Sequence, residues 1–309
     1  MDDATARSIV THVGRLVAEH YVFAEVGSDL ARLLHQRTTD GRYDRAGDAA
    51  ALAALVTEDL QSANGDKHLR LLHSADDVPA DTDEAQLARL TRDASADGSG
   101  IAQLERLPGN VALLCLRPIL YPPQIAGEAM VDALRLVADA DALIIDLREC
   151  RGGAPDMVML VCTYLLGNEP LHVEDFVSRE GHLRQYWTLP YVPGPRFGPD
   201  KPLYVLTGPA TFSGGESLSY ALQQTGRATI VGERTGGGAH PREGFRVHPH
   251  LEASIPVARG ISHLSGDNWE GTGVRPDVPA PAADSRDVAL HLALSGRPRA
   301  DHNTFDLNE

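Results

Sequence analysis

One segment places a serine where it could act as a nucleophile. Residues 203–207 have the apolar pattern of a buried strand, and Ser213-Gly-Gly-Glu216 follows a tight turn, just before a helix expected from about Ser217. Backbone N–H groups at a helix start have no partner inside the helix, so they can stabilise an oxyanion formed when the serine hydroxyl attacks a carbonyl. Ser213-x-x-Glu216 is also a capping box. The local sequence leaves nucleophile and simple cap open and favours the cap.

A nucleophilic serine needs a base, and histidine is the side chain best matched to proton transfer near neutral pH. The first candidate is His68, in Asn64-Gly-Asp-Lys-His68. The chain has 13 histidines, so spacing alone does not select one. His240, in Gly238-Ala-His240-Pro, is a rival base.

Two further segments could complete such a site. Glu270 follows Trp269 and precedes glycines, and an acid there could orient a histidine and stabilise its charged form, although the segment also fits a polar turn. A second apolar strand ends in Asp146-Leu-Arg-Glu-Cys-Arg-Gly152-Gly153. Glycines after a strand expose backbone N–H groups, which suits an oxyanion site, although they also permit a sharp turn.

Composition excludes several function classes. The formal net charge is −15, from 43 acidic and 28 basic residues, and such a surface repels phosphate backbones, so no nucleic-acid partner is expected. The sequence has no zinc-type Cys/His pairing or calcium loop, and Gly236-Gly-Gly238 lacks the Lys of a phosphate loop. We therefore expect no cofactor and no metal. The three cysteines suggest reduced packing residues.

The sequence also indicates where the protein is located. No apolar run approaches the roughly 20 residues that a membrane-spanning helix needs, and the first residues lack the pattern of a secretory signal. The sequence predicts a cytoplasmic protein without a membrane partner. It gives no indication of the oligomeric state.

The pattern of apolar residues that predicts secondary structure changes along the chain. We predict an N-terminal helical domain over 1–75, a linker over 76–100, an α/β core over 101–297 and a flexible tail over 298–309. Within the core, continuous apolar strands alternate with helices, which indicates a largely parallel sheet. The predicted strands are 111–116, 142–147, 203–207 and 229–231, and the predicted helices are 125–138, 155–166, 217–224 and 287–294.

Four motifs, in this order, resemble a known family. They are Asp146-Leu-Arg-x-x-x-Gly-Gly153, Thr211-Phe-Ser-Gly-Gly-Glu216, Val231-Gly-Glu-x-Thr-Gly-Gly-Gly-Ala-His-Pro241 and Asn268-Trp-Glu-Gly-Thr-Gly-Val-x-Pro-Asp277. They are similar to the tail-specific serine peptidases (family S41), above all to the repeat of interphotoreceptor retinoid-binding protein and to the tricorn-like branch. The likeness covers nearly the whole chain.

The resemblance implies a crotonase-like α/β core, joined to a small N-terminal helical bundle without a PDZ domain. The carboxyl-terminal processing branch uses a lysine base, but this chain has Gly238 at that position. The tricorn-like branch uses serine, histidine and glutamate, which correspond to Ser213, His68 and Glu270. Where that branch has a serine before its histidine, this chain has Lys67.

The family's oxyanion donors correspond to the backbone of Gly214 and of Gly152 or Gly153. The resemblance also implies an active site in the cleft between the helical bundle and the core. Substrate specificity would then come from this cleft, for which the candidate binding residues are Tyr186, Trp187, Tyr191 and His240.

The function expected from the resemblance is a serine hydrolase acting on a peptide or small acyl substrate through an acyl-enzyme. Two alternatives stay open at this point. One is a non-catalytic binder of an apolar small molecule. The other is a biosynthetic-pathway hydrolase or cyclase acting on an ester, amide or lactone.

Overall fold

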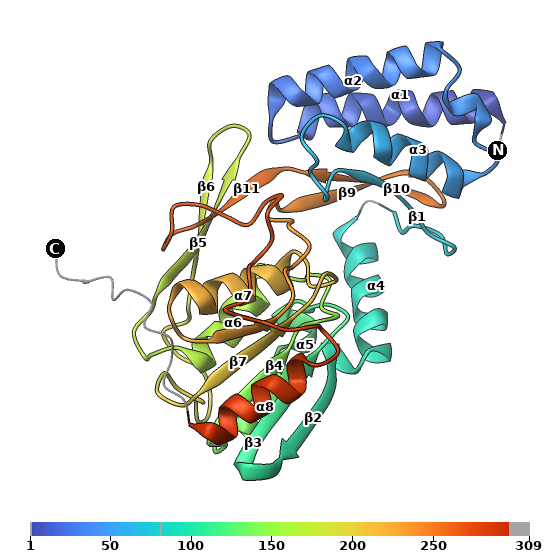
Figure 1. Ribbon diagram of the computed structural model, residues 1–309. Coiled ribbons are helices and arrows are strands. Elements are labelled where there is room, and N and C mark those ends of the chain that lie inside the picture. Colours follow the sequence, from blue (N-terminus) through green and yellow to red (C-terminus); the bar gives the residue numbers. More distant parts are fainter. Residues whose placement is uncertain (1, 81, 297–309) are drawn as a thin grey trace. The chain divides into compact units, whose positions relative to one another are not determined.

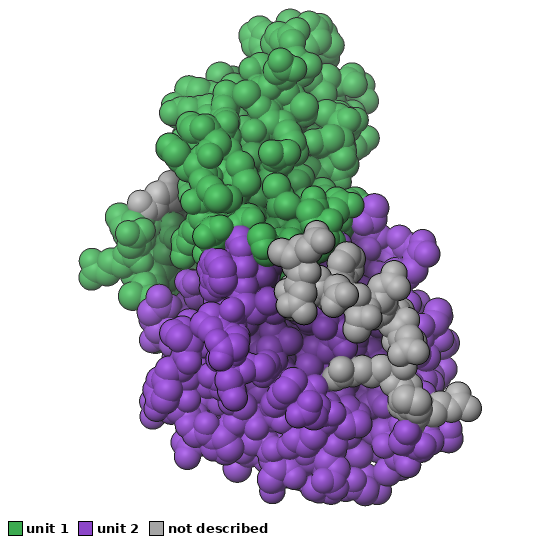
Figure 2. All heavy atoms as spheres, turned by 90° about the vertical axis from the view of Figure 1, so that its left-hand side faces the viewer, with its two compact units in different colours: residues 1–93, 174–185, 238–271 green, residues 94–173, 186–237, 272–309 purple. Residues whose placement is uncertain are grey.

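The computed structural model describes residues 2–80 and 82–296, so the predicted tail over 298–309 lies outside the described residues. The chain forms two compact units (Figure 2). Unit 1 contains residues 1–93, 174–185 and 238–271, and unit 2 contains the rest. The sequence predicted continuous domains, whereas these units are built from interleaved segments.

Three helices open unit 1, as the apolar periodicity predicted: α1 (Asp3–His20), α2 (Ala24–Thr39) and α3 (Ala49–Gln61), with the short 3-10 turn η1 (Tyr43–Arg45) between the last two. Asp2 caps α1 by accepting from the backbone N of Thr5 at 2.7 Å, and Asp48 caps α3 by accepting from that of Ala51 at 2.8 Å. These bonds satisfy amide groups that a helix start leaves without partners.

A three-stranded antiparallel sheet completes unit 1 in the order β1 (Arg70–His73), β10 (Leu251–Pro256), β9 (Arg242–His248). Arg70 of β1 lies opposite Ser254 of β10. The sheet and the three helices share one apolar core, and the helices lie along one side of this sheet (Figure 1). This core includes the buried residues Val10, Val13, Leu30, Leu52, Val56, Leu71, Leu251, Ala253 and Ile255.

A second three-stranded sheet has the order β11 (Ala258–Ser262), β5 (His172–Ser178), β6 (Leu183–Trp187), with β11 antiparallel to β5. The stretch predicted as a linker over 76–100 contains the helix α4 (Asp83–Ala96). No helix among the described residues is both long and apolar enough to cross a membrane.

Unit 2 is built on a six-stranded sheet in which only the β2–β3 pair is antiparallel, which confirms the predicted α/β class and the largely parallel sheet. The strand order is β12 (Val278–Pro279), β8 (Thr229–Gly232), β7 (Leu203–Thr207), β4 (Ala142–Asp146), β3 (Val111–Leu116), β2 (Ile101–Leu107). The helices are α5 (Pro123–Val137), α6 (Pro155–Leu165), α7 (Gly214–Gln224) and α8 (Ser285–Ser295), with 3-10 turns η2 (Gly98–Gly100) and η3 (Pro108–Asn110).

Helices cover the sheet of unit 2 on two sides (Figure 1). On the α8 side, Ala289 belongs to one buried apolar cluster with Leu113 of β3, Ile144 of β4 and Leu206 of β7. The neighbouring residues of these strands point the other way and are also buried. Burial on both faces explains why the strands read as continuous apolar runs rather than as alternating ones.

Candidate active site

Ser213 lies at the turn between β7 and α7, directly before the first residue of the helix. Its backbone has φ 50° and ψ −119°, and it is one of three non-glycine residues with positive φ in the described part of the chain. Such a conformation costs on the order of 1 to 3 kcal/mol and persists only where the surroundings hold it in place. The backbone N of Phe212, next to it, donates to the carbonyl of Cys150 at 2.9 Å. The serine turn is therefore tied to the segment that carries the glycine pair.

The capping box that the sequence suggested is present at this turn. Glu216 is fully buried, and its Oε2 accepts a hydrogen bond from the backbone N of Ser213 at 2.9 Å. Its Oε1 accepts from the Thr235 hydroxyl at 2.5 Å and from the backbone N of Gly237 at 2.7 Å. The carboxylate thus joins the serine turn to the loop after β8. Capping fixes the position of Ser213 and does not exclude a chemical role.

The predicted oxyanion glycines lie beside Ser213. Gly152 and Gly153 have φ values of 137° and 135°, a region that favours glycine. A Cβ added to Gly152 would lie 3.1 Å from Ser213 Cβ and 3.5 Å from its Oγ, and one added to Gly214 would lie 2.9 Å from the N of Gly153. Since Gly214 is the first residue of α7, its N–H has no acceptor inside the helix. The four residues therefore bring backbone donors next to the hydroxyl.

The other predicted residues meet in unit 1. His68 lies in the turn between α3 and β1, where its backbone carbonyl accepts from Ser254 Oγ at 2.6 Å. Asp66, His68 and Glu270 each have one side-chain nitrogen or oxygen in a common cluster, in which these three atoms lie within 4.8 Å of one another. The histidine and the glutamate that the resemblance pairs are thus brought together, and both histidine and Asp66 are buried.

His240 belongs to the same cluster. Its Nδ1 lies 2.8 Å from Asp66 Oδ2 and 3.5 Å from Glu270 Oε2. The Glu270 Oε2 also accepts from the backbone N of Ala239 at 2.6 Å. The Phe23 ring packs edge-on against the imidazole, with ring centroids 5.4 Å apart.

Asp66 is the functional candidate that the sequence reasoning missed. Its Oδ1 accepts from the backbone N of His68 at 3.0 Å, and its Oδ2 accepts from the Tyr21 hydroxyl at 3.0 Å. An aspartate two residues before a histidine can form this local side-chain to backbone bond, so the spacing Asp66-x-His68 was the available signal.

Electrostatics keep His68 in its basic form. Burial lowers the pKa of His68 to about 4, and the charges of Arg70, Arg242 and His240 act in the same direction, while the charge of Asp66 opposes them. At neutral pH the ring therefore has a lone pair that can accept a proton.

Asp66 is held as a carboxylate. Burial alone would raise its pKa, but the hydrogen bond from His240 and the charges of His240 and His68 outweigh burial and leave the pKa below its usual value. Burial and, after it, the Asp66 charge raise the pKa of Tyr21, so its hydroxyl stays a donor. Asp66 therefore acts as an acceptor for its neighbours.

The predicted substrate-binding aromatics differ in exposure. Tyr186 is buried, whereas Trp187 and Tyr191 are 45% and 76% exposed. The Trp187 ring stacks on His172, with centroids 4.6 Å apart and an interplanar angle of 8°. Trp187 and Tyr191 thus offer ring surface to a ligand, while Tyr186 is placed as a packing residue. A binding role for any of these residues or His240 stays a prediction.

The candidate residues are divided between the two units. Ser213, Gly214 and the glycine pair belong to unit 2, and His68, His240 and Glu270 belong to unit 1. Each of these two groups of residues is assembled within its own unit. The approach of His68 to Ser213 stays a prediction.

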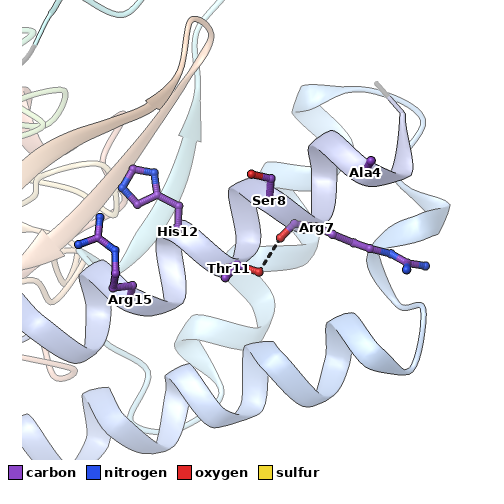
Figure 3. Close-up of a pocket in the computed structure, with 6 residues that line it drawn as sticks. All are labelled: Ala4, Arg7, Ser8, Thr11, His12 and Arg15. Carbon is purple, nitrogen blue, oxygen red and sulfur yellow. Dashed lines mark hydrogen bonds between the residues drawn. The ribbon is translucent and has the colours of Figure 1, made fainter.

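A surface hollow on α1 contains none of the candidate residues. It is lined by Ala4, Arg7, Ser8, Thr11, His12 and Arg15 (Figure 3). The Thr11 hydroxyl donates to the carbonyl of Arg7 at 2.8 Å, so its hydrogen is used within the helix. We assign this hollow no part in the chemistry.

Comparison with known proteins identifies the family. The model of peptidase family S41 matches residues 122–280, which is about half of the chain, and a model of the N-terminal domain of Peptidase_S41 in eukaryotic IRBP matches residues 3–99. The chain therefore belongs to peptidase family S41.

Individual relatives agree with this assignment. A carboxyl-terminal-processing protease of Picosynechococcus sp. is 31% identical over 144 residues, 46% of this chain and 32% of that protein. The chain thus matches about a third of that relative's length.

Two solved structures share the fold over nearly their whole length. A putative peptidase from Parabacteroides merdae has a TM-score of 0.64 at 16% identity, covering 96% of this chain and 99% of that one. A lipoprotein from Streptococcus agalactiae has a TM-score of 0.63 at 14% identity, covering 94% and 97%.

Proposed function

We propose that this chain is a serine peptidase that cleaves peptide bonds through an acyl-enzyme. Ser213 attacks the peptide carbonyl while His68 takes its proton, and the resulting oxyanion accepts hydrogen bonds from the backbone of Gly214 and of Gly152 or Gly153. The protonated His68 then gives its proton to the leaving amine. Water, activated by the same imidazole, hydrolyses the ester and restores Ser213. Glu270 orients the imidazole and stabilises its charged form.

The observation that carries the proposal is the conformation of Ser213. The residue is held at positive φ at the start of α7, against Gly152, whose missing side chain leaves room beside the hydroxyl. A serine that only capped the helix would not need that backbone strain. Gly238 in place of the lysine of the processing branch is the reason to assign the base to His68.

The proposal includes the finer features expected from the resemblance: a crotonase-like core, no PDZ module and a cytoplasmic location. Without such a module, substrate tails would not be bound by strand addition to it. Specificity would instead come from residues such as Trp187 and Tyr191, whose rings are exposed.

A serine-directed fluorophosphonate tests the proposal. We expect intact-mass analysis to show one adduct, peptide mapping to place it on Ser213, and Ser213→Ala to abolish both the adduct and the hydrolysis of a quenched peptide library. Ser265→Ala, at an exposed serine, is the matched control and should label like the wild type. No adduct and no turnover in the wild type, after full exposure to the probe, would contradict the proposal.

A second candidate is a non-catalytic binder of an apolar small molecule. The match of residues 3–99 to the N-terminal domain model named for eukaryotic IRBP favours it. Titration with an apolar ligand, followed by tryptophan fluorescence, separates the two functions. Equal binding by the wild type and Ser213→Ala, without labelling or turnover in either, would favour the binder. Turnover of small esters or lactones but of no peptide would point to a small-molecule hydrolase.

A further inference from the structure

His240 is a buried histidine that the proposed chemistry does not use. Its Nδ1 faces Asp66 Oδ2 at 2.8 Å, and Phe23 covers part of its ring. Because Asp66 is held as a carboxylate, which only accepts hydrogen bonds, Nδ1 must carry a hydrogen. This contact fixes the orientation of the imidazole and leaves Nε2 as the acceptor in the neutral ring. It is the arrangement in which an acid orients a histidine.

The position of Glu270 depends on the segment that contains His240. Glu270 Oε2 accepts from the backbone N of Ala239 at 2.6 Å and lies 3.5 Å from His240 Nδ1. The indole N–H of Trp269, the residue before Glu270, donates to the carbonyl of Gly238 at 2.9 Å. Two hydrogen bonds therefore join residues 238–240 to the glutamate and its neighbour.

Asp66 connects the two histidines. It accepts from the backbone N of His68 through Oδ1 and lies in hydrogen-bond contact with the ring of His240 through Oδ2. The Tyr21 hydroxyl provides a further donor to Oδ2 at 3.0 Å, and Asn64 Nδ2 donates to that hydroxyl at 2.7 Å. With so many donors on a buried carboxylate, the ring of His240 and the backbone at His68 are both held in place.

We propose that Asp66 and His240 are positioning residues, a second acid–histidine pair that holds Glu270 beside His68 and sets the charge around His68 as it takes up a proton. The inference rests on the proposed function, because it assigns His68 as the base. The two residues would act through Glu270 and His68 and would not touch the substrate.

Asp66 and His240 have opposite effects on the protonation of His68. The groups that face His68 are Asp66, Glu270, His240, Arg70 and Arg242. The negative charge of Asp66 favours the protonated imidazole, whereas positive charge on His240, Arg70 or Arg242 disfavours it. Removing the charge of Asp66 should therefore lower the pKa of His68, and removing the ring of His240 should raise it.

Three variants test the proposal through the pH dependence of kcat/KM with a quenched peptide. His240→Leu removes the Nδ1 donor, His240→Asn keeps an N–H donor near the same place, and Asp66→Asn removes the charge and replaces one acceptor oxygen with an amide donor. The matched control is His35→Leu, at an exposed histidine of α2. Thermal unfolding of each variant shows whether it is folded at the temperature of the assay.

We expect His240→Leu to lower kcat by about 10- to 100-fold with little change in KM, since a misplaced base forfeits part of the 10²- to 10⁴-fold that general base catalysis contributes. The acid limb of the kcat/KM profile should move to higher pH in His240→Leu and to lower pH in Asp66→Asn. His240→Asn should recover at least about tenfold of the lost kcat. The control should match the wild type.

Unchanged kcat and acid limb in His240→Leu would overturn the proposal. So would equal losses in His240→Leu and His240→Asn without movement of the acid limb, because packing damage alone would account for them.

An NMR titration of the His68 ring separates this inference from the proposed function. If the wild type neither labels nor turns over, the proposed function fails. The titration in Asp66→Asn and His240→Asn still reports whether the pair controls His68. Shifts of opposite sign would support the control of His68 by Asp66 and His240, and an unmoved titration in both variants would refute it.

Discussion

The Glu216 carboxylate accepts a hydrogen bond from the backbone N–H of Ser213 at 2.9 Å. That N–H is consequently occupied and is not the donor for an oxyanion at the serine. The N–H of Gly214, one residue further into α7, is the donor that the helix start leaves available. The cap therefore leaves the N–H of Gly214, and not that of Ser213, for the proposed oxyanion site.

Glu216 should be essential to the serine turn. Glu216→Ala leaves the donors of Ser213, Thr235 and Gly237 without their acceptor, and each buried donor left unpaired costs about 1 to 3 kcal/mol. Glu216→Gln keeps the volume and one acceptor oxygen, so it should remain folded but label with fluorophosphonate about tenfold more slowly. Urea unfolding and labelling rates measure the two effects. Glu128→Gln, at an exposed residue of α5, should change neither, and wild-type behaviour of Glu216→Ala would refute this role.

Gly152→Ala should strongly reduce activity. The new Cβ would lie 3.1 Å from Ser213 Cβ, and the backbone φ of 137° is one that alanine rarely adopts. Displacing the oxyanion donors should lower kcat by on the order of 10²-fold. Gly167→Ala provides the control, because a Cβ there meets nothing within 4 Å. Equal kcat values for the two variants would show that Gly152 does not border the reaction.

The strain at Ser213 should be visible in stability. Ser213→Ala and Ser213→Gly both remove the hydroxyl, but glycine adopts φ 50° without the penalty of a side chain. We expect the glycine variant to be more stable than the alanine variant by about 1 kcal/mol in urea unfolding. This difference already allows for the larger chain entropy of glycine in the unfolded state. The same pair of substitutions at Ser265 should give the opposite order. An alanine variant that is the more stable one at Ser213 would contradict the strain.

His68 should make stability depend on pH in a defined window. Its pKa is about 4 in the folded protein against an ordinary value of 6.5. Between these values the unfolded chain binds a proton that the folded chain does not, so the free energy of unfolding falls as the pH is lowered from about 6.5 to about 4.

His68→Gln should lack this dependence. The difference in the free energy of unfolding between this variant and the wild type should change by on the order of 3 kcal/mol across the window. Urea unfolding at a series of pH values measures it, with His35→Gln as the control. Parallel curves for wild type and His68→Gln would contradict the buried, neutral imidazole.

The sequence predicted the core of unit 2 well, because local signals determine it. The strand Val111–Leu116 was predicted with its observed bounds, since burial on both faces requires a continuous apolar run. The serine turn was equally legible, because its glycines and the capping glutamate lie within a few residues of Ser213.

What the sequence did not reveal depends on contacts between distant segments. β1 has only four residues and exists because β10, far along the chain, pairs with it. Asp66 was missed for the same reason, since its partner His240 lies 174 residues away. Local periodicity does not depend on such distant partners. It therefore could not predict that the two units consist of interleaved segments, or that His240 lies next to an acid.

The pairing of β1 with β10 also constrains when the protein can finish folding. During synthesis α1–α3 and β1 precede unit 2, but β9 and β10, which complete their apolar core, are made only after most of unit 2. Until β10 emerges, side chains such as Leu52 and Val56 lack part of their final cover, and a nascent chain with such a surface is exposed to aggregation and to chaperone binding. The helices α1–α3 therefore complete their apolar core only after β9 and β10 have been made.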